Sequence, residues 1–259
     1  MKDTEGILVY IKLMMMSQPY ILDETEDFAV VFKPPGMHCA PLSQKDGGTL
    51  LEWFALQCPA YDVELMHRLD FETHGLVLFA KNPESYKFFK SLQDKGEFIK
   101  EYSAICTDST SEDTVPGFPP IPYCYAAAHP LPALYFPPFI VESYFRPYGP
   151  GRKLVRPVID DGKKLKEIAS DKGGFYKTEI TGISGYLFTV RLKRGFRHQI
   201  RCHLSWIGCP ILNDPLYPRP AEKTTENGLA LRAHGLFFAD LSGRRREYRI
   251  VPLNCDIRY

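Results

Sequence analysis

The chain has 259 residues, of which 44% are hydrophobic and 24% are charged, and its formal net charge is +1. This length is enough for a substantial core, and a nearly neutral chain gives no overall electrostatic indication of a nucleic-acid partner. Seven scattered cysteines without a Cys-x-x-Cys pair favour free thiols in a reducing cytoplasm over a disulfide scaffold or a structural zinc site. The free thiols lead us to expect a cytoplasmic protein. No apolar run is long enough to cross a bilayer, so we expect no membrane partner.

Apolar runs separated by turn residues predict the elements of the first part of the chain. Lys33-Pro34-Pro35-Gly36 is a strong turn signal that ends one strand. Asn82 followed by Pro83 is typical of a helix start, because an Asn side chain caps free N–H groups and proline suits the first turn. In chain order, we expect a strand or ordered arm at 7–16, a strand at 28–32, a helix at 49–57, a buried strand at 76–80, a helix from 83 to about 93 and a strand at 100–105.

The second part begins with residues 110–157, which are rich in proline and aromatic residues and lack regular periodicity. We expect them to belong to an irregular surface insertion at about 107–172, although their Tyr and Phe side chains are also able to stack on nucleic-acid bases. Periodicity then predicts strands at 176–180 and 186–192, a helix at 197–207, and strands at 229–232, 236–239 and 248–251. This order predicts a single α+β domain with a mixed, largely antiparallel central sheet and flanking helices.

Asp70 is the first candidate catalytic residue. It lies in a short polar turn within the string His67-Arg68-Leu69-Asp70-Phe71-Glu72-Thr73-His74-Gly75-Leu76-Val77-Leu78-Phe79-Ala80-Lys81. Catalytic groups often lie on loops that rigid elements hold in place. Asp is also a common turn residue, so the turn alone favours a structural role.

The segment 194–204 carries the second group of candidate residues. Metal binding by His198, His203, Cys202 and Cys209 is one interpretation, but residues five apart on a helix point to different faces. The apolar stripe of Ile200, Leu204 and Ile207 favours an ordinary helix whose polar residues lie beside the core. Basic residues are dense at 163–166, 191–201 and 244–246, where they could bind phosphates or form a solvated surface.

Taken together, these strings resemble the motifs of the RluA family of pseudouridine synthases. The string at 67–81 resembles the signature His-Arg-Leu-Asp, two variable residues, Thr-Ser-Gly, three aliphatics, a variable residue and Ala-Lys, with only the Ser replaced, by His74. Residues 195–201 are similar to Gly-Arg-Thr-His-Gln-Ile-Arg, except at Phe196 and Arg197, and Cys202-His203-Leu204 follows at the position of the family's Val-His-Leu. Similar strings occur at 28–36, 100–104, 208–217 and 229–233, the last with Arg232 in place of His.

The resemblance implies a role for each matching residue. Asp70 would be the catalytic carboxylate, Arg201 its ion-pair partner, and Tyr102 the aromatic that stacks on the target base. Ile200 would pack under that base, and Arg68 would contact the nucleotide backbone. Gln199 belongs to the intact core of the second motif and is expected at the substrate, whereas His67 is either a further polar contact or a structural donor. The departures at Phe196 and Arg197 bear on secondary RNA contacts and on the choice of target more than on the chemistry. His74 and Arg232 are two further departures, to which the resemblance assigns no role.

The resemblance implies an enzyme that converts a specific uridine of structured RNA, ribosomal or transfer, to pseudouridine. It also implies that no metal or other cofactor is needed, and a monomer is the default expectation. Because the family motifs begin close to the first residue, we expect no separate small N-terminal RNA-binding domain of the kind that some relatives carry. One alternative is a catalytically inactive RNA-binding protein with the same fold. Another is an aspartyl-phosphate hydrolase, but residues 70–73 match its Asp-x-Asp-x-Thr turn poorly because the second acid is Glu72.

Overall fold

The computed structural model describes residues 17–42, 47–107, 115, 117–120, 137–159, 175–217 and 228–253. The predicted arm at 7–16 lies outside these residues. The chain forms two compact units: the first combines the described residues up to Phe98 with Ala233–Ile250, and the second combines those of Ile99–Arg232 with 251–253. Among the described residues, no helix has the length and apolar character needed to span a membrane. The expectation of a single catalytic domain stays a prediction.

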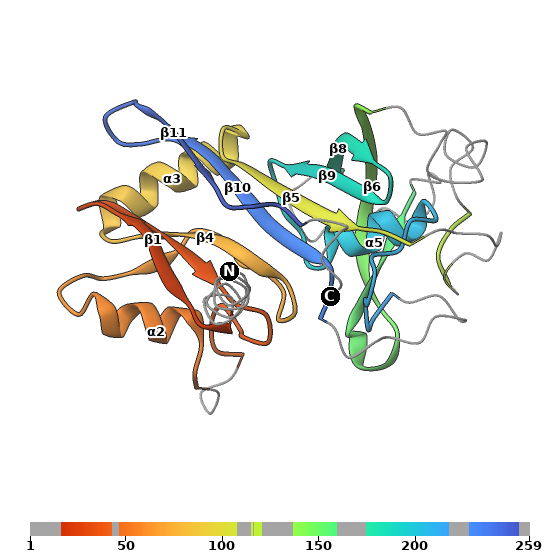
Figure 1. The fold of residues 1–259 in the computed structure, drawn as a ribbon, viewed down its shortest axis with the longest axis horizontal. Helices are drawn as coiled ribbons and strands as arrows, with labels where there is room; N and C mark the ends of the chain where they lie inside the picture. The colour runs from red at the N-terminus through yellow and green to blue at the C-terminus, as the bar shows by residue number, and fades with distance from the viewer. Residues whose placement is uncertain are drawn as a thin grey trace, which may run out of the picture. The chain divides into compact units, whose positions relative to one another are not determined.

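The first unit is built on strands in the order β1-β2-β4-β10, with β3 beside β4 and β11 beside β10. Figure 1 shows helices α3 and α2 on opposite sides of these strands. The elements are β1 (Tyr20–Glu24), β2 (Phe28–Lys33), α2 (Leu50–Gln57), β3 (Glu64–Leu65), β4 (His74–Ala80), α3 (Pro83–Lys95), β10 (Leu231–Ala239) and β11 (Arg245–Arg249).

Strand β4 is buried along its whole length because a helix covers each of its faces. Leu76 and Leu78 share an apolar cluster with Phe89 of α3. On the other face, the ring of Phe79 lies 4.4 Å, centroid to centroid, from the ring of Phe54 of α2. A strand covered on both faces has no polar side to alternate with the apolar one. This explains the continuous apolar run and confirms the buried strand predicted there.

Local capping signals fix the helix that follows. The side chain of Asn82 accepts a hydrogen bond from the backbone N–H of Ser85, Pro83 occupies the first turn, and Gly96 ends the helix in the left-handed conformation, with φ of 71°. The predicted start is confirmed, and the helix continues two residues beyond the predicted end. Helix α2 begins in the same way, because Thr49 and Glu52 form a capping box.

The second unit is built on strands in the order β5-β9-β8-β6-β7, and every neighbouring pair in this series is antiparallel. These pairings, together with the antiparallel β1–β2, β2–β4 and β10–β11 pairs of the first unit, confirm the predicted α+β class with a largely antiparallel sheet. The elements are β5 (Ile99–Ile105), β6 (Phe139–Tyr148), the short 3-10 helix η1 (Pro150–Arg152), β7 (Leu154–Val158), β8 (Tyr176–Ser184), β9 (Leu187–Leu192) and α5 (Gln199–Trp206).

Part of the insertion is regular, contrary to the prediction. Residues 139–158 form a hairpin of β6 and β7, in which the alternate residues Val141, Ser143 and Phe145 are buried. Prolines obscured this alternation, since Pro147 and Pro157 lie inside the two strands. Most of the remaining insertion lies outside the described residues.

Helix α5 begins two residues later than predicted, because His198 adopts a left-handed conformation with φ of 54°. The helix is fixed to the sheet by His203, which is fully buried. Its Nδ1 lies 2.7 Å from Oγ1 of Thr178 on β8, and its Nε2 lies 2.9 Å from Oγ of Ser143 on β6. Burial lowers the pKa of His203 to about 3, so the side chain is neutral at physiological pH.

Gly75 offers a test of close strand packing. Its φ is 127°, and a Cβ atom there would lie 2.1 Å from the carbonyl oxygen of Ala233 in β10. We expect Gly75→Ala to lower the free energy of unfolding by about 2–5 kcal/mol, because backbone strain and overpacking add. Gly243→Ala is the control, since φ there is 81° with no atom within 4 Å, and it should lose only about 1–2 kcal/mol. Equal losses in urea unfolding would contradict this interpretation.

His203 predicts a pH dependence of stability. Between pH 6.5 and about 3 the unfolded chain binds a proton at this histidine and the folded chain does not, so stability falls as pH falls through this range. His203→Gln should reduce the slope by up to about 1.4 kcal/mol per pH unit. The measurement is urea unfolding at a series of pH values, with His38→Gln as the control for loss of a histidine. An unchanged slope in the His203 variant would show that this histidine charges in the folded state.

Candidate active site

The turn that carries Asp70 is held by hydrogen bonds to the backbone on both sides of it. The N–H of Leu69 donates to Sγ of Cys39 at 3.2 Å. The carbonyl of Phe71 accepts from the N–H of Gly36 at 3.0 Å. Within the turn, the N–H of Thr73 donates to the carbonyl of Asp70 at 3.1 Å. The turn before β4 therefore has a fixed backbone, and the carboxylate of Asp70, which is half-buried, is attached at its centre.

Lys33 joins this turn to the turn that follows β2. Its side chain is fully buried, and Nζ donates to the carbonyls of Pro34 at 2.9 Å, Met37 at 2.8 Å and Phe71 at 3.1 Å. Burial lowers the pKa of Lys33 to about 8, while the charges of Asp70 and Glu72 oppose that decrease. At neutral pH the ammonium is therefore a buried positive charge within electrostatic reach of the Asp70 carboxylate.

The two residues predicted beside Asp70 differ in their surroundings. Nε2 of His67 accepts a hydrogen bond of 3.2 Å from the backbone N–H of Leu78 in β4. This is a structural contact, but the ring nitrogen is its acceptor, whereas the sequence suggested a structural donor. Arg68 is exposed, as a contact to a nucleotide backbone would need. Substrate contacts by either residue stay predictions.

The remaining predicted residues lie in the second unit. Tyr102 is on β5 opposite Val190 of β9, and its side chain is buried. Ile200, also buried, is in the first turn of α5. Gln199 uses its carboxamide within the protein, because Nε2 donates to the carbonyl of Lys177 at 2.9 Å and Oε1 accepts from the N–H of Phe196 at 2.9 Å. Gln199 thus holds the segment before α5 against β8, and its contact with substrate stays a prediction.

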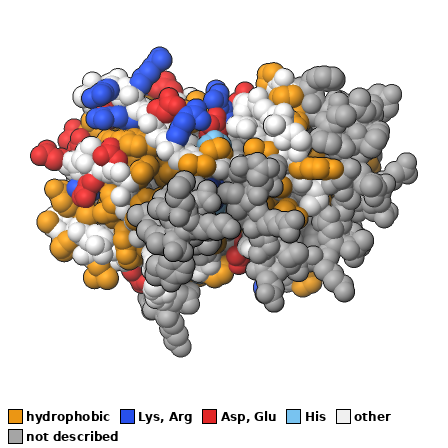
Figure 2. Space-filling view, viewed as in Figure 1, with side chains coloured by type: hydrophobic (Ala, Val, Ile, Leu, Met, Phe, Trp, Pro, Cys, Tyr) orange, Lys and Arg blue, Asp and Glu red, His pale blue; other side chains and the backbone are white. Residues whose placement is uncertain are grey.

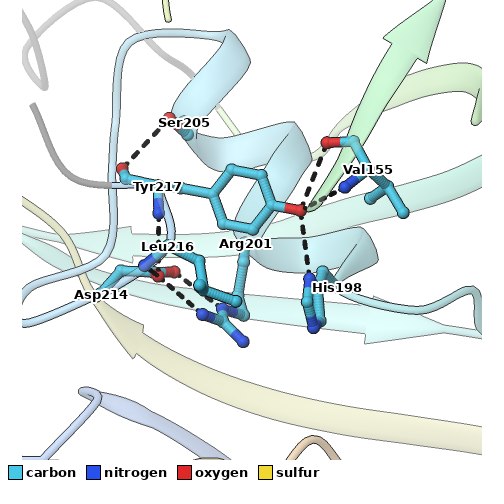
Figure 3. A network of polar contacts seen from close by, with 7 residues as sticks. All are labelled: Val155, His198, Arg201, Ser205, Asp214, Leu216 and Tyr217. Atoms are coloured by element: carbon cyan, nitrogen blue, oxygen red, sulfur yellow. Dashed lines mark hydrogen bonds and ion pairs between the residues drawn. The ribbon is translucent and has the colours of Figure 1, made fainter. Parts of the chain in front are cut away.

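Arg201 forms a two-point ion pair with Asp214. Its Nε donates to Oδ2 at 2.8 Å and its Nη2 donates to Oδ1 at 2.7 Å, and both side chains are buried (Figure 3). Oδ1 of Asp214 also accepts from the N–H groups of Leu216 and Tyr217. A planar guanidinium held along one edge keeps a fixed orientation. Asp214 therefore sets the direction of the remaining Arg201 donors.

Tyr217 extends this network to the hairpin of β6 and β7. Its ring centroid lies 5.5 Å from Cζ of Arg201. Its hydroxyl accepts from the N–H of Val155 at 2.9 Å and lies 3.1 Å from Nδ1 of His198 (Figure 3). Burial raises the pKa of Tyr217 well above its ordinary value, so this hydroxyl stays protonated and is able to donate to the carbonyl of Val155 at 3.2 Å.

Asp70 belongs to the first unit and Arg201 to the second, and the ion pair expected between them stays a prediction. Lys33, Asp214 and Tyr217 have no role that could be assigned from the sequence. The string at 208–217 was the available signal, since Asp214 and Tyr217 lie within it. Among the described residues, no group of three or more His, Cys, Asp or Glu side chains is placed to hold a metal ion. His198 instead contacts Tyr217, and Cys202 and Cys209 are buried and form no disulfide.

The ion pair of Arg201 and Asp214 predicts a large loss of stability when one partner is neutralised. We expect Asp214→Asn to lower the free energy of unfolding by about 3–5 kcal/mol, because it removes the carboxylate partner of a buried charge. Glu247→Gln is the control, since it breaks an exposed pair with Arg249 and should cost at most about 1 kcal/mol. A double-mutant cycle with Arg201→Met should show coupling. Additive losses would contradict a direct interaction.

Comparisons with known proteins agree with the motifs. Residues 27–206 match a family model described as RNA pseudouridylate synthase. An uncharacterized RNA pseudouridine synthase of Mycoplasma pneumoniae is 29% identical over 233 residues, which cover 88% of this chain and 66% of the relative. A ribosomal large subunit pseudouridine synthase D of Buchnera aphidicola is 26% identical over 204 residues, 75% of this chain and 52% of the relative.

The chain thus spans between about half and two thirds of the length of these two relatives. The structure of human RNA pseudouridylate synthase domain containing 1 aligns with a TM-score of 0.61 at 16% identity, over 91% of this chain and 84% of that one. At this identity the alignment shows a shared fold. Because the family match covers residues 27–206 and includes Asp70, Tyr102 and Arg201, the chain belongs to the RNA pseudouridylate synthase family, as its resemblance to the RluA enzymes predicts.

Proposed function

We propose that this protein converts a specific uridine in structured RNA, ribosomal or transfer, to pseudouridine, with Asp70 as the catalytic carboxylate. The observation that carries the proposal is the Asp70 turn itself. Its backbone is held by Lys33, Gly36 and Cys39. The acidic side chain of Asp70 therefore lies on a rigid loop, within the region that matches the family. The names of the ribosomal relatives support large-subunit ribosomal RNA as the first substrate to test.

The reaction needs few protein groups. The bond from N1 of the base to C1′ of the ribose breaks, the base turns, and C5 becomes joined to C1′. C5 then loses its proton and N1 gains one, so the product is an isomer of uridine and there is no net oxidation or reduction. An ionised Asp70 would attack the sugar or remove a ribose proton. Arg201 would be its ion-pair partner, and a guanidinium makes strong charge-assisted hydrogen bonds to a carboxylate. The isomerisation itself requires neither a metal ion nor a nucleotide cofactor.

Three further residues would bind the target nucleotide. The uridine must leave its stack to reach Asp70, at a cost of a few kcal/mol. Tyr102 would stack on the displaced base and Ile200 would pack beneath it, while the exposed Arg68 would contact the RNA backbone. We expect the protein to work in the cytoplasm and as a monomer. The alternative, an RNA-binding protein without activity, is not favoured because Asp70, Tyr102 and Arg201 are all retained.

Asp70→Asn separates these two functions. It removes the charge with almost no change of volume, so we expect a folded protein that still binds RNA and forms pseudouridine at least about a hundredfold more slowly. The measurement is a chemical map of pseudouridine in ribosomal and transfer RNA from cells that lack the protein and are complemented with each variant. Glu72→Gln, two residues away, is the matched control and should restore wild-type modification.

Two outcomes would contradict the proposal. If no pseudouridine disappears from either RNA pool when the protein is absent, the chain has no such activity in those RNAs. If Asp70→Asn restores full modification, another group performs the chemistry.

A further inference from the structure

The hairpin of β6 and β7 presents a face on which basic and aromatic side chains alternate. Tyr144, Arg146 and Tyr148 point to the same face of β6 because strand side chains alternate with a period of two. Arg146 lies directly opposite Arg156 of β7. Arg146 is exposed, and Tyr144, Tyr148 and Arg156 are half-buried. The opposite face of the strand carries the buried Phe145.

The positive charge of this hairpin is not balanced by acidic residues that the structure describes. Within 139–158, Glu142 is the one acidic residue, and it pairs with Lys177 at 3.2 Å. Arg152 and Lys153 at the tip are exposed and add two more charges. Like charges directly opposite each other destabilise a strand pair. Arg156 is already engaged within the protein, since its Nη1 donates to the carbonyl of Gly117 at 2.8 Å and its Cζ lies 5.6 Å from the centroid of the Tyr148 ring. An anionic partner that binds Arg146 would reduce the repulsion between the two arginines.

The hairpin is attached to the segment that leads into the second catalytic motif. The ring of Phe196 stacks on that of Phe145, with centroids 5.1 Å apart and planes at 7°. Nη2 of Arg197 donates to the carbonyls of Arg152 at 2.7 Å and Leu154 at 3.1 Å. Phe196 and Arg197 are the two departures from the family motif, and both contact the insertion. They fix the hairpin next to the residues that begin α5.

Another charged surface of the protein differs in kind. Over the part of the first unit where Figure 1 shows β11 and α3, Lys and Arg side chains are interleaved with Asp and Glu (Figure 2). Several basic residues there have acidic partners, as in the pairs Arg246–Asp240, Arg249–Glu247 and Lys90–Asp94. Mixed charge of this type is typical of a solvated surface. It supplies the control site for the hairpin.

We propose that the β6–β7 hairpin is an RNA-binding element, in which Arg146, Arg152 and Lys153 contact backbone phosphates and the Tyr144 ring packs against the nucleic acid. This inference rests on the proposed function, because it names a second contact of the same RNA substrate. Arginine with interleaved aromatic residues suits RNA, since guanidinium groups bind phosphates and aromatic rings stack on bases. The coupling through Phe196 and Arg197 places the bound RNA in a fixed relation to α5.

The test uses Arg146→Glu, which we expect to weaken RNA binding without lowering the stability of the fold. A glutamate opposite Arg156 forms a favourable cross-strand pair, so thermal stability should not fall. Affinity for fluorescently labelled bulk transfer RNA and for fragments of ribosomal RNA should weaken. The slope of log K against log salt concentration should decrease by about 0.7–0.9 for each phosphate that the variant no longer binds. The KM for RNA should rise several-fold with kcat unchanged, because Arg146 is not placed in the catalytic machinery.

The control is Lys87→Glu on the exposed side of α3, which changes the net charge by the same amount. A second hairpin variant, Arg152→Gln with Lys153→Gln, covers the case in which Arg146→Glu disturbs the fold. The proposal is overturned if the hairpin variants lose no more affinity and salt dependence than the control. If wild-type protein binds RNA through the hairpin but forms no pseudouridine, the proposed function fails and this inference stands. If modification is normal and hairpin variants bind normally, this inference alone fails.

Discussion

The buried ion pair of Arg201 and Asp214 constrains the second unit, because a buried guanidinium needs a fixed negative partner. The segment that follows α5 is arranged around this pair. Arg201 and Asp214 have side chains that are 3% and 0% exposed. Removing two ions from water is expensive unless further hydrogen bonds satisfy them. Asp214 meets this requirement by accepting the N–H groups of Leu216 and Tyr217. The segment after α5 therefore wraps around the pair, and Tyr217 continues the contacts to Val155 of the hairpin.

The elements with local signals could be predicted from the sequence, and those set by distant contacts could not. Helix α3 follows from Asn82 and Pro83, which act on their own neighbours, and β4 follows from an apolar run that suits burial on both faces. The late start of α5 depends on His198, whose left-handed conformation has no local signature. The β6–β7 hairpin contains Pro147 and Pro157, which are unusual inside strands. The alternation of buried and exposed residues along it can be recognised only when the pairing of the two strands is known.

The candidate site shows the same division. Asp70 could be found because it lies in a contiguous motif. Asp214 could not be given a role, since it lies 13 residues after Arg201 and meets it only once the chain reverses. The contacts made by the residues that depart from the family motifs can also be seen only in the structure. Arg232 donates to the carbonyl of Val251 at 2.9 Å, and His74 lies with its ring centroid 6.4 Å from that of Phe32. These substitutions are accommodated by contacts that surround them.

The three anchors of the Asp70 turn all act on backbone atoms of Leu69 and Phe71, the residues on either side of it. These contacts order the backbone of the turn when the protein folds, so less of its entropy has to be lost when RNA binds. Ordering a loop on binding subtracts from affinity, and a loop that is already ordered avoids this penalty. The part of the RNA contact that falls on this turn should accordingly resemble the docking of two rigid surfaces, with a heat-capacity change that reflects buried area and not the folding of a loop.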